Sequence, residues 1–395
     1  MIEHIEIEGF KSLRKVSLDL GAFNLFIGAN ASGKTNFFDA LRVLQGIGYG
    51  FTIDEIFNGK PKGAASEAWD PIRGGSANAA TVDNTGLSGA EIRFAVRAND
   101  YGVPGPELRY AISMTPNPPA VAHESLFSGE TTVFDTSQWG LNYPQPALAL
   151  DRRRLPEITQ EQQIKMWGLR ADTLAKMRSF CKVLSDVQLL NPQPTVLRGY
   201  STAATARRMG EHGENFATLV KRIMSSEGAP EAYTSWLKGL TPAEFDEVKT
   251  LEGAMQDYVF ALRKNVKDFP ASVLSDGTLR FAALVAAFFQ PELPHLLLIE
   301  EIENGIHPSR LQVLLELLKS QSGHPLPQTF ATTHSPLVLA WLDEADYKTT
   351  FLCRKNEETG ETTITPLAQV PRFVELARNQ HASDLFAEGW MESAL

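Results

Sequence analysis

Residues 28–35 read G-A-N-A-S-G-K-T and constrain the possible fold more than any other stretch of the chain. The pattern fits G-x-x-x-x-G-K-[ST], in which glycines let the backbone curl until successive N–H groups face a phosphate. In that pattern Lys34 can reach the β- and γ-phosphates, and the Thr35 hydroxyl can bind Mg²⁺. An apolar strand at 23–27 leads into the loop, and a helical run at 36–44 leaves it. This context favours a phosphate-binding loop at the positive end of a helix over a chance glycine-rich turn.

The composition limits the class of protein. The chain has 395 residues, of which 43% are hydrophobic and 21% are charged, as in an ordinary globular protein with a sizeable core. At about 150 residues per domain, this length allows two or three units, or one large α/β unit with insertions. The net charge of −10 gives no overall basic footprint for nucleic acid, although a local groove can still be positive.

Three further features predict a cytoplasmic protein with no membrane partner. The two cysteines, Cys181 and Cys353, cannot form a disulfide framework, which suits a reducing compartment. The first residues lack the basic and apolar regions of a signal peptide. The longest apolar run, residues 281–289, is far shorter than the roughly 20 residues that span a bilayer.

Hydrophobic periodicity predicts the elements around the loop. Alternation of apolar and polar residues predicts strands at 2–7, 16–20, 92–96, 108–114, 120–127 and 131–134. The glycine- and serine-rich stretch 50–89 predicts a loop with little regular structure. Helical spacing and first-turn prolines predict helices at 157–185, 215–224, 230–240 and from Pro242. We therefore expect an N-terminal lobe with antiparallel strands at residues 1–150 and a helical insertion at 151–270. A third lobe at 271–345 and a C-terminal hairpin with a short helix at 346–395 would follow.

Several charged residues have two interpretations. Lys11 is interpreted as a solvated edge lysine, and a position near the phosphates or the ribose is the alternative. The basic clusters 152–154 and 207–208 are interpreted as solvated surface, and a contact with nucleic acid or a protein partner is the alternative.

Residues 274–280, L-S-D-G-T-L-R, predict a second anion site far along the chain. Ser275 is a suitable N-cap for the apolar helix that follows, and Gly277 lies in its first turn. A serine and a glycine at a helix start can bind an anion, whereas the same motif on its own also fits a plain capped core helix. The motifs that follow it favour the anion site.

An apolar strand at 295–299 ends in the paired acids Glu300 and Glu301. This is the Walker B arrangement, in which the first acid holds Mg²⁺ directly or through water, and the second orients and deprotonates the attacking water. Most P-loop proteins use aspartate at the first position, and Glu300 is one methylene longer. Solvated carboxylates at a strand end are the alternative.

A further strand at 328–332 delivers T-H-S-P at 333–336, in which Ser335 caps the next helix. His334 at the carboxyl end of a parallel strand can hydrogen-bond a γ-phosphate or its attacking water, with a structural histidine as the alternative. Glu303 and His307 are secondary candidates, and shaping the loop after Glu301 is their alternative role.

These motifs together resemble the ABC-type ATPases of the SMC/RecF/OLD branch, in particular the predicted AAA-type ATPases related to the OLD (overcoming lysogenization defect) proteins. The matching stretches are I-E-G-F-K-S-L (7–13), I-G-A-N-A-S-G-K-T-N (27–36), L-S-D-G-T-L-R (274–280), L-L-L-I-E-E-I-E-N-G-I-H-P (296–308) and T-T-H-S-P (332–336). They cover residues 1–45 and 270–340 and leave the middle weakly matched. The resemblance implies an α/β P-loop NTPase: an ABC-type head with a mixed core sheet, an antiparallel β lobe and a helical signature lobe.

The resemblance also implies roles for individual residues. Two heads would sandwich ATP with Mg²⁺, and the signature serine of one head would contact the γ-phosphate held by the other. Catalysis would use Glu301, His334 and Lys34, and Thr35 and Glu300 would bind the metal. The residues expected to contact the nucleotide are Gly28, Asn30, Ser32, Gly33, Lys34, Thr35, Asn36, Ser275 and Gly277.

The chain departs from the family pattern in the signature, in Glu300 at the first Walker B position, and in the glutamine that links the two lobes. The signature has Asp276-Gly277-Thr278 where transporter subunits have Gly-Gly-Gln/Glu. The glutamine that links the two lobes has no clear equivalent, and the candidates are Gln160, Gln162, Gln163 and Asp151. The tail after His334 has no acid cluster with room for the TOPRIM nuclease that many OLD relatives carry, so we expect any nuclease to be a separate protein.

The sequence is therefore interpreted as an ATP-hydrolysing switch that works as a homodimer or higher oligomer. A DNA-related or phage-defence process with a nuclease or toxin effector in trans fits this interpretation. The alternatives are a transporter ATPase subunit, an ATP-gated scaffold without hydrolysis, and a repair ATPase stimulated by DNA.

Overall fold

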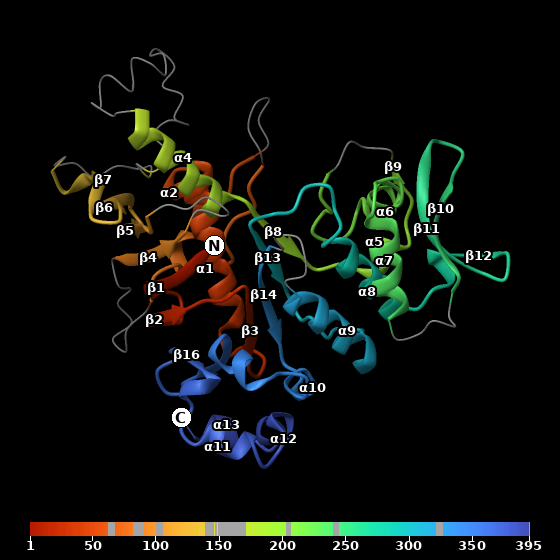
Figure 1. Ribbon diagram of the computed structural model, residues 1–395. Helices are drawn as coiled ribbons and strands as arrows, with labels where there is room; N and C mark the ends of the chain where they lie inside the picture. The colour runs from red at the N-terminus through yellow and green to blue at the C-terminus, as the bar shows by residue number, and fades with distance from the viewer. Residues whose placement is uncertain are drawn as a thin grey trace. The chain divides into compact units, whose positions relative to one another are not determined.

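The computed structural model describes residues 1–61, 68–81, 91–99, 106–138, 146, 148, 171–202, 207–239, 245–320 and 327–394 (Figure 1). These residues form two compact units, each assembled from separate stretches of the chain. The first unit contains Met1–Gly21, Gly28–Val187 and Phe351–Pro366. The second contains Ala22–Ile27, Gln188–Thr350 and Leu367–Leu395.

A six-stranded antiparallel sheet dominates the first unit, in the order β2-β1-β4-β5-β6-β7. Its strands are β1 (Ile2–Phe10), β2 (Leu13–Asp19), β4 (Ile92–Ala98), β5 (Leu108–Pro116), β6 (Pro119–Ser128) and β7 (Thr131–Asp135). Alternate residues such as Ile5, Phe94 and Ile112 are buried on one face, while the residues between them face solvent. The strands predicted by alternation are confirmed, because one buried face imposes a two-residue period.

The helices of the first unit are α1 (Lys34–Tyr49), α2 (Ile53–Asn58) and α4 (Ala171–Ser185). Helix α1 approaches α4 closely at Gly48, where an added Cβ would lie 2.7 Å from the backbone nitrogen of Ser185. The prediction of little regular structure at 50–89 was wrong for α2, which begins with a capping box between Thr52 and Glu55. A hairpin of β15 (Thr350–Lys355) and β16 (Thr362–Pro366) completes this unit, as predicted.

The second unit contains a run of strands in the order β3-β14-β13-β8. The bounds are β3 (Phe23–Ile27), β8 (Val187–Leu190), β13 (Leu296–Ile299) and β14 (Gln328–Thr333). Strand β14 pairs in parallel with both β3 and β13. Every residue of β3, β13 and β14 is buried, as expected for parallel strands that are covered on both faces. Helices α8 (Asp276–Ala286) and α9 (Pro308–Lys319) begin close to the predicted positions.

The expectation that residues 151–270 form a helical insertion was wrong in part. Helices α5 (Pro194–Leu197), α6 (Phe216–Met224) and α7 (Ala229–Lys238) lie there. The same range also contains a second sheet, β10-β11-β12 with β9 paired to β11. Its strands are β9 (Ser201–Thr202), β10 (Glu247–Glu252), β11 (Asp257–Lys264) and β12 (Lys267–Pro270). The helix expected from Pro242, the basic cluster 152–154 and the four candidates for the linking residue lie outside the described residues.

The C-terminal part of the second unit consists of short helices rather than the single one expected. They are α10 (Pro336–Leu339), α11 (Phe373–Ala377), α12 (Ala382–Ala387) and α13 (Trp390–Ser393). Short 3₁₀ turns occur at Ser76–Asn78, Thr136–Gln138, Ala271–Val273, Glu344–Lys348 and Leu367–Gln369. Among the described helices, none has the length and apolar character needed to cross a bilayer.

Candidate functional site

The predicted phosphate loop connects β3 to α1. Ala31 has φ of +63° and Gly33 has φ of +101°, and Gly33 is the residue that caps α1. Left-handed residues alternating with right-handed ones turn successive N–H groups toward one point, which makes a concave anion site. The first residues of α1 also leave N–H groups without helical acceptors. The loop therefore has the backbone form that the motif predicts.

The Lys34 side chain reaches back across the loop. Its Nζ donates to Gly28 O at 2.7 Å and to Ala29 O at 2.8 Å, and it lies 3.4 Å from Ser32 Oγ. Asn30 is exposed and Thr35 is half-buried. Asn36, also expected at the nucleotide, donates from Nδ2 to Ser12 Oγ at 2.6 Å. Lys34 thus holds a positive charge at the mouth of the loop.

The β15–β16 hairpin supports the phosphate loop through contacts that sequence reasoning missed. Thr362 Oγ1 donates to Ser32 O at 3.1 Å and lies 2.7 Å from Ser12 Oγ. A Cβ added to Gly33 would lie 2.2 Å from Thr362 Oγ1, and one added to Gly28 would lie 2.3 Å from Cys353 O. Both glycines are therefore required by packing as well as by phosphate access. No local sequence signal marks Thr362, because it lies 330 residues from Ser32.

Lys11 is not a solvated edge residue, so our preferred interpretation was wrong. Its Nζ lies 2.5 Å from Asp39 Oδ2 on α1, and the two side chains are only 10% and 1% exposed. Burial of both charges requires that each keep the other as partner. Lys11 therefore ties the β1–β2 turn to the helix that follows the phosphate loop.

The predicted Walker B acids follow the buried strand β13. Glu300 is half-buried, whereas Glu301 is exposed and has φ of +48°, a conformation that is unfavourable for a residue with a side chain. The N–H of Glu301 donates to Thr332 Oγ1 on β14 at 2.9 Å. This contact ties the strained backbone of Glu301 to β14.

Arg280 on α8 supplies a second restraint on the acids. Its Nη2 donates to Glu300 O at 3.0 Å and to Glu301 O at 3.1 Å, while Nη1 donates to Pro192 O at 2.9 Å and Asn191 Oδ1 at 3.2 Å. The residue is 3% exposed, and this burial lowers the pKa of Arg280, against the opposing effect of the charges of Glu301 and Glu303. Arg280 belongs to the motif 274–280, but sequence reasoning gave it no role.

The signature residues lie at the start of α8. Ser275 is exposed and is the N-cap, with its Oγ accepting from the N–H of Thr278 at 3.2 Å, as predicted. A Cβ added to Gly277 would lie 2.3 Å from Gly305 O, in the loop that follows the Walker B acids. Arg310 on α9 donates to Thr278 Oγ1 at 2.6 Å. The signature and the Walker B loop are therefore packed together.

The parallel pairing relates the strand ends to one another. Ile27 of β3 pairs with Thr333 of β14, and Ile299 of β13 pairs with Ala331 of β14. The next residues along the chain are Gly28 and His334 after the first pair, and Glu300 after Ile299. Ligand sites of parallel α/β sheets lie at the carboxyl ends of their strands. The phosphate loop therefore follows β3 and the acids follow β13, and both strands pair in parallel with β14.

Comparisons with known proteins agree with this arrangement. A family described as "AAA ATPase domain" matches residues 1–63, and a family described as "AAA domain, putative AbiEii toxin, Type IV TA system" matches residues 186–340. An Smc head bound to the C-winged helix domain of ScpA has a TM-score of 0.53 at 14% identity, with 93% of this chain and 98% of that chain covered. The chain is therefore similar to AAA-type ATPase domains over two separate stretches and has the fold of an Smc head.

Two further matches separate the similarity in fold from the similarity in sequence. An Smc head domain with an extended coiled coil, from Pyrococcus furiosus, has a TM-score of 0.53 at 12% identity, with 95% of this chain and 99% of that chain covered. A Helicobacter pylori protein named "ATP/GTP phosphatase" is 30% identical over 121 residues. That match spans 29% of this chain and 30% of the relative. The solved structures therefore show the fold, and the sequence relative is similar over under a third of its length.

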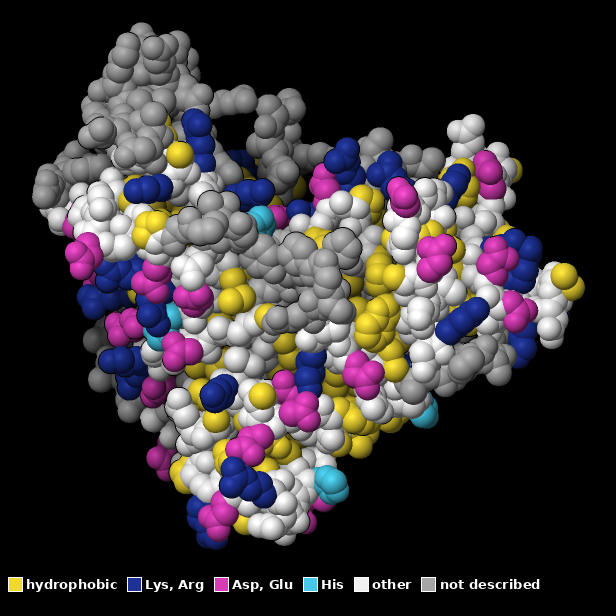
Figure 2. Space-filling view, in the orientation of Figure 1, with side chains coloured by type: hydrophobic (Ala, Val, Ile, Leu, Met, Phe, Trp, Pro, Cys, Tyr) yellow, Lys and Arg dark blue, Asp and Glu magenta, His cyan; other side chains and the backbone are white. Residues whose placement is uncertain are grey.

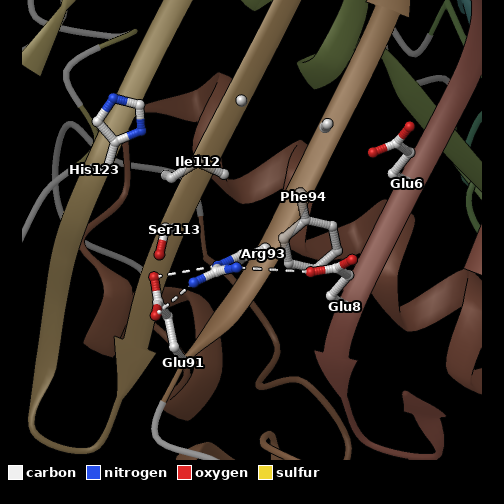
Figure 3. A pocket seen from close by; sticks show the side chains of 10 residues that line it. Glu6, Glu8, Glu91, Arg93, Phe94, Ile112, Ser113 and His123 are labelled. Atoms are coloured by element: carbon white, nitrogen blue, oxygen red, sulfur yellow. Dashed lines mark hydrogen bonds and ion pairs between the residues drawn. The ribbon is translucent and has the colours of Figure 1, made fainter. Parts of the chain in front are cut away.

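The protein also has two hollows of ≈ 350 and ≈ 390 Å³ on the solvent-facing side of its antiparallel sheet, and Figure 3 shows the larger one. Small residues, Ala95 and Ala111, pair across β4 and β5 at their shared floor. Arginines line both hollows: Arg93 lies 3.1 Å from Glu91, and Arg97 lies 3.6 Å from Glu107. These charges are satisfied by neighbours on the same face, as expected for a solvated sheet surface.

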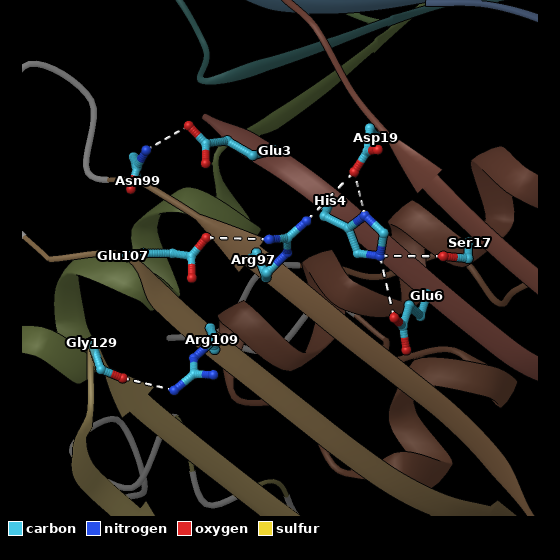
Figure 4. Close-up of polar contacts among 10 residues, drawn as sticks. All are labelled: Glu3, His4, Glu6, Ser17, Asp19, Arg97, Asn99, Glu107, Arg109 and Gly129. Atoms are coloured by element: carbon cyan, nitrogen blue, oxygen red, sulfur yellow. Dashed lines mark hydrogen bonds and ion pairs between the residues drawn. The ribbon is translucent and has the colours of Figure 1, made fainter. Parts of the chain in front are cut away.

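One cluster on this face has the residue types of a hydrolytic triad. His4 Nδ1 lies 2.7 Å from Asp19 Oδ1, and Ser17 Oγ lies 3.3 Å from His4 Nε2 (Figure 4). However, Glu6 Oε1 lies 3.2 Å from the same Nε2 atom, and the Asp19 side chain is 84% exposed. A catalytic base needs that nitrogen free to take the serine proton. The cluster is therefore a surface hydrogen-bond network.

Proposed function

We propose that this ATPase hydrolyses ATP with Mg²⁺ in a dimer of heads and signals the nucleotide state to a protein effector. The observation that carries the proposal is the pairing of β3, β13 and β14, whose carboxyl ends continue into the phosphate loop, the two acids and His334. Phosphoryl transfer depends on positioning and charge stabilisation, and these residues supply both kinds of group.

The nucleotide would bind through the loop N–H groups and the Lys34 ammonium. Among the described residues, no group of three or more His, Cys, Asp or Glu side chains could hold a metal alone. Mg²⁺ typically uses one or two protein oxygens together with phosphates and water, so Thr35 and Glu300 suit it. The bound Mg²⁺ would neutralise charge on the β- and γ-phosphates.

Hydrolysis would use Glu301 as the base that orients water and His334 as the group at the γ-phosphate. The strained backbone of Glu301, held by Thr332 and Arg280, supports this role because such strain persists where function requires it. The exposed Ser275 at the start of the eleven-residue helix α8 supports a role for the signature in binding the partner head's nucleotide.

The effector belongs to the proposal as well. The match of residues 186–340 to a family described as "AAA domain, putative AbiEii toxin, Type IV TA system" supports a defence process, in which a nuclease or toxin effector would act in trans. A scaffold that binds ATP without hydrolysis is the second candidate. A repair ATPase would be stimulated by DNA, and a transporter role would require a membrane partner.

The test measures ATP turnover with and without double-stranded DNA, and mass by light scattering, for wild type, Glu301→Gln and Lys34→Ala. We expect Glu301→Gln to lower kcat by about 10²–10⁴-fold, the usual contribution of a general base, and to hold a dimer in ATP. Lys34→Ala should lose ATP binding and stay monomeric. A wild type that binds ATP with neither turnover nor a change in mass would contradict the proposal and favour the scaffold.

A further inference from the structure

We propose that Glu303 is a positioning residue for His334, which fixes the orientation and hydrogen placement of its ring. The inference rests on the proposed function, since it concerns how His334 is presented to the γ-phosphate. Glu303 lies in the loop after β13, two residues beyond Glu301. Sequence reasoning gave it only a secondary place, with shaping the loop as an alternative.

One carboxylate oxygen of Glu303 serves two groups of His334. Glu303 Oε1 accepts from the backbone N–H of His334 at 2.8 Å and lies 3.0 Å from the ring Nδ1. The Glu303 side chain is 10% exposed, whereas the His334 side chain is 46% exposed. The carboxylate is therefore fixed within the protein, and the ring it holds is open to solvent.

This contact determines which ring nitrogen is available for chemistry. A carboxylate oxygen can only accept, so the position of Oε1 at 3.0 Å from Nδ1 favours a hydrogen on that nitrogen. The ring is then held by its Nδ1 edge, and Nε2 is the nitrogen left to meet a phosphate oxygen or a water. The hydrogen bond made by one ring nitrogen sets the role of the other, as in metal-bound and catalytic histidines.

The second oxygen of Glu303 provides an independent observation. Oε2 is buried and accepts no hydrogen bond from any described residue. A buried acceptor without a partner is destabilising, and a carboxylate with a purely structural role would be expected to use both oxygens. A residue that only capped the His334 N–H would need one neutral acceptor. A carboxylate at this position is explained if Oε1 orients the His334 ring and Oε2 accepts a hydrogen bond from a donor in the nucleotide-bound state.

A double-mutant cycle separates this role from a role in loop stability. We expect Glu303→Ala to lower kcat by about 10–100-fold, as loss of an orienting partner does, with little change in KM. The same substitution in a His334→Ala background should have almost no further effect, because both changes remove one function. Glu303→Gln, which preserves volume, guards against a folding defect. Glu316→Ala, at an exposed acid on α9, is the matched control and should leave kcat unchanged.

A spectroscopic measurement tests the ring contact without any hydrolysis. The ring ¹⁵N signals of His334, assigned among the eight histidines with a His334→Gln variant, should move in Glu303→Ala and stay in place in Glu316→Ala. Unchanged signals, or additive losses of kcat in the double variant, would overturn the proposal. If wild type fails to hydrolyse ATP, the proposed function fails, while the ¹⁵N signals still decide whether Glu303 holds the ring.

Discussion

The phosphate loop and the Walker B edge serve one proposed reaction but are stabilised by different physical means. The loop is shaped by the absence of side chains at Gly28 and Gly33, where the β15–β16 hairpin leaves no room for a Cβ. The acid edge is shaped by a buried cation, Arg280, that binds the carbonyls of a strained turn. Steric exclusion defines the first region and charge-assisted hydrogen bonding the second. We therefore expect substitutions in the two regions to fail in different ways.

The largest expected effect is at Arg280. Replacement by methionine should lower the free energy of unfolding by about 2–4 kcal/mol, because buried carbonyl acceptors lose a charged donor. Turnover should fall as the Glu301 backbone relaxes. Urea unfolding measures the change, with Arg207→Met as control, since the exposed Arg207 pairs with the exposed Glu292 and should contribute under about 1 kcal/mol. Equal losses of unfolding free energy in the two variants would show that Arg280 stabilises the protein no more than a surface ion pair does.

Gly33→Ala is expected to have the next largest effect, which is on ATP affinity. The new Cβ meets Thr362 in a backbone conformation that favours glycine, which should cost about 1–3 kcal/mol and weaken ATP binding about 10–100-fold. Calorimetric titration with a non-hydrolysable ATP analogue measures this. Gly228→Ala is the matched control, because Gly228 has φ of +76° with nothing within 4 Å. Gly228→Ala should lower the free energy of unfolding through backbone strain and leave the ATP affinity unchanged.

The hairpin beneath the loop gives a pH-dependent prediction. Burial raises the pKa of the Cys353 thiol to about 12, against the opposing charge of Lys34. The folded thiol keeps its proton while the unfolded thiol ionises above about pH 9, so stability from this group is full at neutral pH. As the pH rises from about 9 toward 12, the free energy of unfolding then falls by about 1.4 kcal/mol per pH unit. Unfolding of wild type and Cys353→Ala between pH 8 and 10 should reveal this slope in wild type alone.

The smallest effect is expected at Thr362→Val. The substitution keeps the volume against Gly33 but removes the hydroxyl that bonds Ser32 and Ser12. We expect a loss of about 1 kcal/mol, seen as a several-fold weaker ATP affinity with unchanged kcat. A change in kcat at constant affinity would show that the hairpin acts on catalysis instead.

The sequence predicted those parts of the fold that local pattern determines. The β3–loop–α1 unit, the alternating strands of the first unit and the acids after β13 follow from periodicity and short motifs. Strand β10 has a single buried residue, Val248, so it lacks the alternation that marks a half-buried strand. Helix α2 did carry a readable signal, because Thr52 and Glu55 form a capping box.

The supporting contacts of the candidate site were beyond sequence reasoning. Lys11 pairs with Asp39, and Glu303 with His334, across turns and strands whose pairing no single-sequence pattern reveals. Arg280 looked like the last residue of a motif, and only the fold shows that it meets the Glu301 carbonyl. The motif residues lie at strand and helix ends, whereas their partners are set by tertiary packing.

The contact between Thr362 and Ser32 also has a consequence for synthesis of the protein. The phosphate loop leaves the ribosome early, but the hairpin that packs beneath it is made more than 300 residues later. Because such distant contacts close late, the nascent chain holds its nucleotide motif long before the motif has its support. A ribosome-bound chain that ends before residue 350 should therefore bind ATP poorly. Translation would in this way delay nucleotide capture until the hairpin has been made.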